Sequence, residues 1–398
     1  MQNAYLPIVI PPPCSPNADM YSLRAYGEMI SDAGRFDAYA NAIARAVRPG
    51  DVVLEIGCGP GLFSLLACRA GAARVYAIET DDVIHLAKQL ASANGLADRI
   101  KFLQSDSRRT ELPERANVIV SDIRGSLPLF EHAISSMEDA RKRFLAPGGI
   151  MIPHRDTLQA AVVEAKEYYE GLTAPWQKAM DGLDLSSTLS LILNEKYGVS
   201  FKPGQLLTQP LTCHVLDYTA GAATRATAAL RFRVTRTGTA HGLCLWFEAQ
   251  LFGEIGYSSG PGGASTIYGQ AFLPWLEAVE VTEGQEILVE LHADFVGGDY
   301  VWRWDTRIDT PDGGARHFQQ STFQGANFSP NFLHRRAADF VPALSETGEA
   351  ERWLLQAMDG KASLQEIAQE AAKRFPHLFS GWDEAFRRAT ELSGKYSR

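Results

Sequence analysis

In the first part of the chain, short apolar runs alternate with amphipathic segments. The residues VVLEI (52–56) and RVYAIE (74–79) are runs of the kind that form buried parallel strands. Between them, GLFSLLACRAG (61–71) carries apolar residues at helical spacing and ends in glycine, which favours a helix that stops there. The pattern therefore predicts a strand, a tight turn, a helix and a second strand in succession.

After Pro153 the pattern changes to alternation of apolar and polar side chains. Segments 230–235 and 287–292 place an apolar residue at every second position, which is typical of antiparallel strands. The change of period predicts a boundary near Pro153 between an α/β domain and a β-rich domain.

These patterns divide the chain into segments of different character. Residues 21–153 form the α/β domain, and residues 154–330 form a β domain in which 166–203 is a helical insertion. Residues 1–20 are an N-terminal extension, where three consecutive prolines interrupt any signal helix. Residues 331–398 are helical by pattern and predict a small C-terminal subdomain.

Helix signals support that prediction for the tail. Ser363 and Glu366 form a capping box at the start of an amphipathic segment that ends near Phe375. Ser380 with Asp383 gives the start signal of a further helix.

Composition and charge limit the classes of function. The formal net charge of −9 gives no basic footprint for nucleic acid, so a cationic partner fits better. The five cysteines are scattered and none forms a CxxC pair, which favours a reducing compartment and argues against a zinc site. We expect a cytoplasmic protein that binds no metal and does not span a membrane.

The turn between the first two predicted strands carries the first candidate chemistry. Gly57, Gly59 and Gly61 form a GxGxG pattern, which lets a ligand approach the backbone closely. A dinucleotide fingerprint needs a small residue where Leu62 stands, so NAD is disfavoured. The turn, with Glu79 at the end of the second strand, resembles that of class I S-adenosylmethionine methyltransferases, whose acidic residue can accept both ribose hydroxyls. A tight turn without a ligand is the alternative.

Several stretches between Tyr21 and about Ile308 resemble the protein arginine methyltransferase family. They are MISDAGRFDAY (29–39), SDSRRTELPERANVIVSD (105–122), the stretch 121–153 with its L-x-P-G-G-x-x-x-P ending, and PWQKAMDGLDLS (175–186). The resemblance implies a Rossmann-like methyltransferase domain, a β-barrel-like domain with a dimerisation arm, and S-adenosylmethionine as the cofactor. It also implies a homodimer.

The same resemblance assigns roles to individual residues. Arg35 would hold the methionine carboxylate of the cofactor through a charge-assisted pair. Asp106 and Ser107 would contact the adenine, mainly through the backbone, and Glu55 joins the glycines in the cofactor-binding set. Tyr21, at the start of the matching region, is a candidate on the substrate side.

Two acidic positions are candidates for binding the methyl acceptor. The family uses two glutamates nine positions apart to fork around a guanidinium and fix its plane. Asp122 and Glu131 occupy the corresponding positions with the same spacing. Each also has a structural explanation, Asp122 as a polar residue at a strand end and Glu131 as an acid near a helix N-terminus.

This acidic loop departs from the family pattern. Asp122 is shorter than glutamate, Ile123 replaces a tryptophan, and Arg124 adds a cation where the family has methionine. Arg124 could pair with one carboxylate and spoil a guanidinium pocket, or point outward. We include it among the candidate substrate residues.

A second departure concerns the family's T-H-W loop. Ser265, Thr266 and Ile267 stand where threonine, histidine and tryptophan are expected, so the histidine is missing. Thr266 remains a candidate substrate residue. His317 imitates the motif only superficially, because it follows the barrel strands, and we interpret it as a surface or core residue.

Within the tail, WLLQAMDGKASLQEIAQEAAKRF resembles the C-terminal helices of PqqD-like peptide-binding modules. It lacks the paired strands expected for peptide capture by strand addition. A helical cap on the barrel is therefore the preferred interpretation.

The leading hypothesis is an S-adenosylmethionine-dependent methyltransferase, similar to protein arginine methyltransferases, that acts on a side-chain nitrogen of a protein or peptide. One alternative is methylation of a peptide natural product or small molecule. Another is a cofactor-binding protein without catalysis that recruits a partner through its tail.

Overall fold

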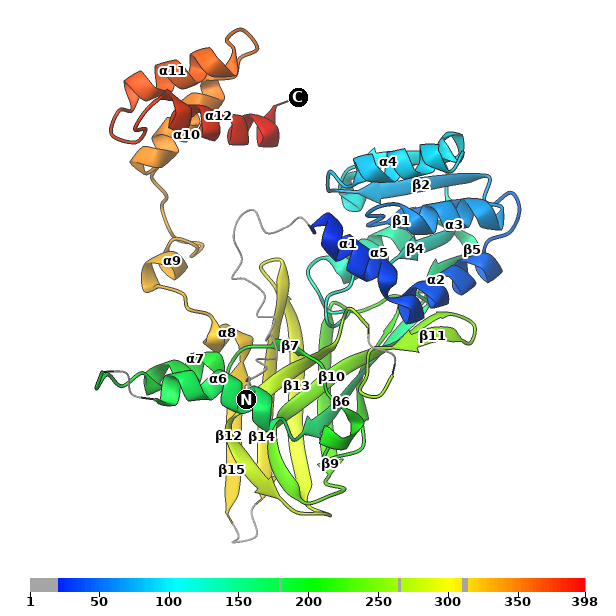
Figure 1. Ribbon diagram of the computed structural model, residues 1–398, viewed down its shortest axis with the longest axis vertical. Coiled ribbons are helices and arrows are strands. Elements are labelled where there is room, and N and C mark those ends of the chain that lie inside the picture. The colour runs from blue at the N-terminus through cyan, green and yellow to red at the C-terminus, as the bar shows by residue number, and fades with distance from the viewer. Residues whose placement is uncertain (1–20, 179–180, 264–265, 310–313, 398) are drawn as a thin grey trace, which may run out of the picture. The chain divides into compact units, whose positions relative to one another are not determined.

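The computed structural model describes the chain from residue 21 to residue 397, apart from 179–180, 264–265 and 310–313 (Figure 1). The predicted N-terminal extension, residues 1–20, lies outside the described residues. The chain divides into two compact units, one ending at Asn327 and the other spanning Phe328–Arg398.

The first part of the larger unit is a five-stranded parallel sheet in the order β3-β2-β1-β4-β5. Its strands are β1 (Val52–Ile56), β2 (Arg74–Glu79), β3 (Ile100–Gln104), β4 (Ala116–Ser121) and β5 (Leu145–Ile152). The helices around it are α1 (Leu23–Ser31), α2 (Ala33–Ala46), α3 (Leu62–Ala70), α4 (Ile84–Ala93) and α5 (Ala133–Arg143), with short 3-10 turns η1 (Ala97–Arg99) and η2 (Ser107–Arg109). The predicted strand, turn, helix and strand are confirmed.

Both faces of this sheet are covered, which explains its continuous apolar strands. On β1, Val53 packs in a cluster with residues of α2 and α3, whereas Leu54 packs with residues of α5. Both side chains are fully buried.

The stretch 29–39 spans the end of one helix and the start of the next. Helix α1 ends at Ser31, and Asp32 then caps α2 by accepting a hydrogen bond from the Arg35 amide at 3.2 Å. An aspartate favours such a cap over a helix interior, and the new start places Arg35 in the first turn of α2.

The β-rich part of the larger unit consists of two antiparallel sheets. One has the order β7-β12-β10-β6-β8, with β11 beside β10, and the other has the order β15-β14-β13-β9. The strands are β6 (Arg155–Val163), β7 (Tyr197–Val199), β8 (Leu211–Asp217), β9 (Arg225–Arg233), β10 (Gly238–Phe252), β11 (Ile255–Ser258), β12 (Gln270–Val281), β13 (Glu286–Val296), β14 (Asp299–Asp309) and β15 (Ala315–Ser321).

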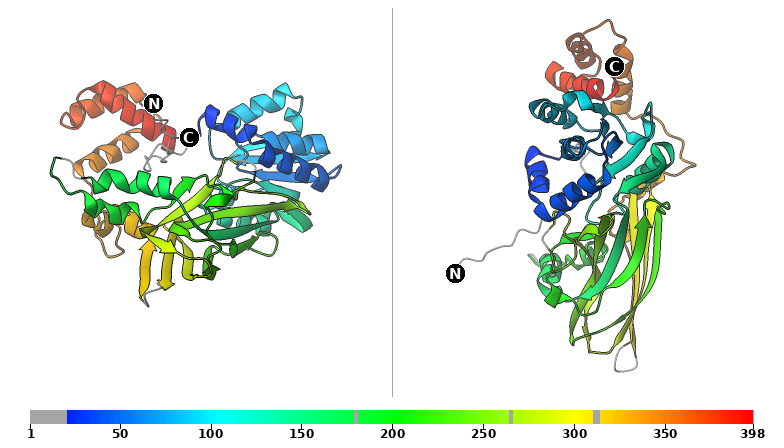
Figure 2. Two further views of the ribbon diagram at one scale, coloured as in Figure 1. Left: turned by 60° about the horizontal axis from the view of Figure 1, so that its bottom comes forward. Right: turned by 90° about the vertical axis from the view of Figure 1, so that its right-hand side faces the viewer.

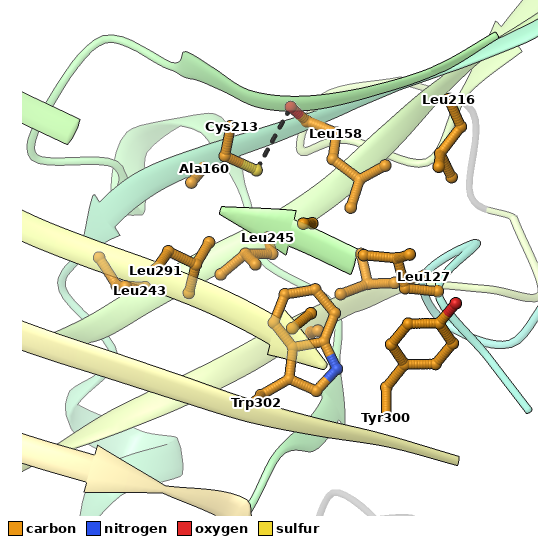
Figure 3. Close-up of a cluster of buried hydrophobic side chains, with 14 of the residues drawn as sticks. Leu127, Leu158, Ala160, Cys213, Leu216, Leu243, Leu245, Leu291, Tyr300 and Trp302 are labelled. Carbon is orange, nitrogen blue, oxygen red and sulfur yellow. Dashed lines mark hydrogen bonds between the residues drawn. The ribbon is translucent and has the colours of Figure 1, made fainter. Parts of the chain in front are cut away.

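The predicted alternation is confirmed in these strands. On β9, Leu230 and Phe232 are buried and Arg231 is exposed. Figure 3 shows Leu158 and Trp302 within the apolar cluster that such inward-facing residues form.

The helical insertion between β6 and β8 is also confirmed (Figure 2). It contains α6 (Lys166–Gln177), η3 (Ser186–Thr188), α7 (Leu189–Ile192) and η4 (Pro203–Gln205), and α8 (Thr322–Gly325) contacts α7. Leu183, between α6 and η3, has an exposed fraction of 63%.

The smaller unit is helical, with α9 (Pro330–His334), α10 (Glu346–Ala357), α11 (Leu364–Arg374) and α12 (Trp382–Tyr396). The predicted capping box of Ser363 and Glu366 starts α11. Helix α12 starts two residues after Ser380. The amide and hydroxyl of Ser380 donate hydrogen bonds to the Glu384 carboxylate, and not to the expected Asp383. None of the helices in the described part of the chain is long and apolar enough to cross a membrane.

Candidate active site

The candidate site lies at the carboxyl ends of β1, β2 and β4. The strand order reverses between β1 and β4, and ligands of open α/β sheets bind at such a switch point. The glycine turn follows β1, Glu79 ends β2, and Asp122 directly follows β4. The sheet therefore brings together segments that the sequence singled out separately.

The glycine turn requires glycine at three positions. Gly57, Gly59 and Gly61 have φ angles of 69°, 50° and 78°, a region that other residues rarely adopt. A Cβ atom at Gly57 would clash with Ile123, and one at Gly59 would lie 3.0 Å from the ring of Tyr26. The turn is thus packed closely between Tyr26 of α1 and Ile123 of the acidic loop, and these contacts leave no room for a side chain.

Glu79 is fixed beside this turn. Its Oε2 accepts a hydrogen bond from the Gly59 amide at 2.8 Å. Its Oε1 accepts from the amides of Thr80 at 2.7 Å and Asp81 at 3.1 Å. These bonds orient a half-buried carboxylate at the edge where a ribose is expected.

Glu55 has a different position from the other predicted cofactor residues. It has an exposed fraction of 3% and accepts a hydrogen bond from the Ser64 hydroxyl of α3. Burial raises the pKa of its carboxyl to about 8. The structure therefore places Glu55 in the interior behind the turn.

The loop after β3 lies beside the end of β2, because the Ser105 amide donates to the Glu79 carbonyl at 2.9 Å. Asp106 caps η2 and pairs with Arg108 at 2.7 Å, which holds the pKa of its carboxyl below the usual range. Ser107 is buried, and its carbonyl accepts from Arg143 at 2.8 Å. The two predicted adenine residues are thus held in a defined backbone conformation.

Arg35 is buried with one nitrogen left unsatisfied. One terminal nitrogen donates to Asp122, and the other donates to the Met29 carbonyl at 2.6 Å. Its Nε has no hydrogen-bond partner among the described residues, and the nearest carboxylate oxygen, Asp32 Oδ2, lies 3.8 Å away, too far for a hydrogen bond. A buried donor of this kind fits an anionic ligand such as a carboxylate.

Asp122 accepts hydrogen bonds from four side chains. Arg35 bonds its Oδ2, while Arg124 at 2.6 Å, Tyr268 at 2.6 Å and Tyr39 at 3.1 Å bond its Oδ1. Burial tends to raise the pKa of this carboxyl, but the two arginines outweigh it and hold the pKa below the usual value. Asp122 is therefore an ionised group inside a network.

Arg124, which the sequence left either paired with a carboxylate or pointing outward, lies in the interior. Its side chain has an exposed fraction of 4% and forks onto Asp156 of β6, with two bonds of 2.9 Å. Tyr218 donates to the same carboxylate at 2.7 Å. Arg124 therefore pairs with carboxylates and does not point outward, because Asp156 and Asp122 both offer buried negative charge.

Glu131 is exposed and lies in a rarely adopted backbone conformation, with φ of 37°. Its amide donates to Asp299 at 3.1 Å, and the next residue, His132, packs edge-on against Phe295. Tyr21 is 55% exposed, and partial burial, with a smaller contribution from the Glu131 charge, raises the pKa of its hydroxyl.

The acidic loop is anchored between these two acids by its apolar residues. Leu127 and Leu129 are buried in the same cluster as the barrel core, where Figure 3 labels Leu127. The loop therefore runs from a buried acid to an exposed one.

The barrel segment that replaces the T-H-W loop reaches the same site. The Ile267 amide donates to Asp32 at 3.0 Å, and the hydroxyl of Thr266 is buried without a partner among the described residues. Ser265 lies outside the described residues.

Tyr268 of this segment was missed by the sequence interpretation. Its hydroxyl reaches Asp122, and its ring stacks on Tyr257 with centroids 6.4 Å apart. A register one residue later would have matched Thr266 to the family's threonine and Tyr268 to its tryptophan. His317 is exposed on β15, which confirms that it is a surface residue.

Comparisons with known proteins agree with this geometry. The family model for ribosomal protein L11 methyltransferase (PrmA) matches residues 39–154, and that for the arginine methyltransferase oligomerization subdomain matches residues 154–296. Protein arginine N-methyltransferase 6 of Xenopus laevis is 30% identical over 274 residues, which cover 65% of this chain and 80% of that protein. The chain belongs to the protein arginine methyltransferase family.

Other members of the family extend the comparison. Probable protein arginine N-methyltransferase 6 of Arabidopsis thaliana is 30% identical over 258 residues, and the match spans 61% of this chain and 59% of that relative's length. The Trypanosoma brucei PRMT1 enzyme-prozyme heterotetrameric complex with AdoHcy has a TM-score of 0.70 at 19% identity, covering 74% of this chain and 96% of that one. This structural likeness shows the arginine methyltransferase fold.

The described residues contain no group of three or more histidine, cysteine, aspartate or glutamate side chains arranged to hold a metal ion.

Proposed function

We propose that this protein is an S-adenosylmethionine-dependent methyltransferase that methylates a side-chain nitrogen of a protein or peptide, with arginine as its acceptor. The observation that carries the proposal is the glycine turn held by Glu79, together with a buried arginine, Arg35, whose Nε has no hydrogen-bond partner among the described residues. Family membership and a relative solved with AdoHcy support it.

The residues present fit the cofactor. Glu79 would accept the ribose hydroxyls, and the loop at Asp106 and Ser107 would line the adenine side. The Arg35 guanidinium would bind the methionine carboxylate through its Nε. When bound, the cofactor supplies an electrophilic methyl group on a sulfonium.

The chain's own residues then position the acceptor. Transfer requires a nitrogen lone pair held about 3 to 3.5 Å from the methyl carbon, in line with the bond that breaks. We infer that Glu131 binds the acceptor guanidinium and localises its charge away from the attacking nitrogen. Asp122 fixes the start of the acidic loop through its bonds to Arg35 and Tyr268.

One observation favours a second candidate, methylation of a peptide natural product or small molecule. Asp122 is buried and bonded to protein donors, including Arg124, so the pair of acids is not displayed as two exposed carboxylates. An acceptor that needs a single acidic partner fits this arrangement too.

We further propose that the protein is a cytoplasmic homodimer assembled through the insertion 166–203. The insertion falls within the match to the oligomerization subdomain and exposes Leu183. The four cysteines in the described part of the chain are free and buried, in keeping with a reducing compartment.

The function is tested with methyl-tritiated S-adenosylmethionine and a cell lysate depleted of endogenous methylation. Label in protein, recovered as methylarginine after acid hydrolysis, supports the arginine proposal. Label confined to small molecules supports the second candidate and contradicts the first.

A further inference from the structure

Four buried charged residues form an alternating chain through the candidate site. Arg35 pairs with Asp122, Asp122 with Arg124 at 2.6 Å, and Arg124 with Asp156 at 2.9 Å. Each of these side chains has an exposed fraction of 8% or less. This series of ion pairs runs from α2 to β6 and joins the α/β part to the barrel.

Asp122 is buried and already paired with two cations. Its Oδ1 accepts from Arg124 and Tyr268, with Tyr39 at 3.1 Å, and its Oδ2 accepts from Arg35, so the protein itself neutralises this carboxylate. A guanidinium from outside would have to enter this buried site and share Oδ2 with Arg35, next to two positive charges that already neutralise the carboxylate.

Asp156 holds Arg124 in this position. Two parallel bonds of 2.9 Å orient the guanidinium plane, and its Nη1 then points at Asp122 and Tyr39. A bidentate pair fixes geometry more firmly than a single contact does. Arg124 is therefore a fixed internal guanidinium at the first acidic position of the loop.

We propose that Arg124, held by Asp156, is a specificity-determining residue that withdraws Asp122 from acceptor binding and leaves Glu131 as the acidic residue that meets the acceptor. This inference rests on the proposed function, because it concerns the acceptor side of the same site. Wild-type protein then binds a guanidinium through one carboxylate and discriminates poorly between arginine and other cationic side chains.

The test removes both members of the pair together, so that no buried charge is left alone. In Arg124→Met with Asp156→Asn, the Tyr218 hydroxyl keeps an acceptor and Asp122 loses one donor. We expect kcat/KM for an arginine peptide to rise about tenfold, the size of one charged hydrogen bond, and that for the matched lysine peptide to stay unchanged.

A matched control makes the same change at a neighbouring ion pair. Arg155 and Asp217 pair at 3.0 Å between β6 and β8, and neither side chain bonds any of the four buried charged residues. Arg155→Met with Asp217→Asn should leave the ratio of arginine to lysine turnover as it is in wild type.

A milder variant guards against failure of the double variant to fold. Arg124→Lys keeps the charge but loses the fork onto Asp156, so a smaller rise in arginine turnover is expected. No rise in either folded variant, with cofactor affinity by calorimetry intact, overturns the inference. The two proposals fail separately. If wild type labels no protein in the lysate but kcat/KM for the arginine peptide rises in a variant, the result upholds this inference and refutes the proposed function.

Discussion

The Glu131 amide donates a hydrogen bond to the Asp299 carboxylate, which lies 168 residues further along the chain at the start of β14. A residue of the barrel thus holds the backbone of the exposed acid in its strained conformation, with φ of 37°. Such strain persists where the surroundings enforce it, and it is common at functional sites.

Replacing Asp299 should therefore impair turnover without affecting the cofactor. Asp299→Ala removes the acceptor of the Glu131 amide, and we expect kcat to fall roughly tenfold from the loss of one charge-assisted bond. Asp299→Asn keeps an acceptor oxygen and should lose less. Asp294→Ala on β13, whose partner is the exposed Arg225, is the matched control and should turn over normally.

Glu79→Ala should weaken cofactor binding. The variant loses a charged acceptor of two hydroxyl hydrogen bonds, at a cost of about 1.5 to 3 kcal/mol, or roughly 10- to 100-fold in Kd. Isothermal titration calorimetry with S-adenosylmethionine measures it directly. Unchanged affinity in a folded variant would refute the ribose role of Glu79.

Glu55 predicts a pH dependence of stability. Its folded-state pKa is raised from 4.5 to about 8, so the folded protein retains a proton that the unfolded chain releases. Stability contributed by this group falls as pH rises between about 4.5 and 8. Glu55→Gln carries no charge, so its Tm should exceed that of wild type at pH 8.5 by a margin that shrinks towards pH 5. A margin independent of pH would show that Glu55 is ionised in the folded protein.

The arm supplies a prediction about assembly. Leu183 is exposed in the insertion, and a charge there should oppose its burial against a second copy. Leu183→Asp should give a monomer by light scattering where wild type gives a dimer. A wild-type protein that is monomeric at micromolar concentration would contradict the homodimer.

The parts of the site that could be predicted from the sequence are local. The turn at Gly57 to Gly61 and the strand ending at Glu79 lie within one strand-turn-helix-strand unit, whose apolar periodicity and glycines mark it directly. The spacing of Asp122 and Glu131 was likewise visible along one loop.

The contacts that define the electrostatics of the site were not local. Asp156 lies 32 residues from Arg124 across the domain boundary, and Tyr268 lies 146 residues from Asp122. Periodicity does not show which barrel residue faces which strand end. The sequence therefore indicated that Arg124 could pair with an acid, but not that a second acid would hold it.

The most direct test of the account measures transfer to arginine by the purified protein and by Glu131→Gln. With methyl-tritiated S-adenosylmethionine and an arginine-containing peptide, wild type should yield labelled methylarginine. Glu131→Gln, which keeps the shape and removes the charge, should lose roughly 100-fold in kcat while calorimetry shows unchanged cofactor affinity. Near-normal turnover in that variant, or wild-type label that never appears on arginine, would contradict the account.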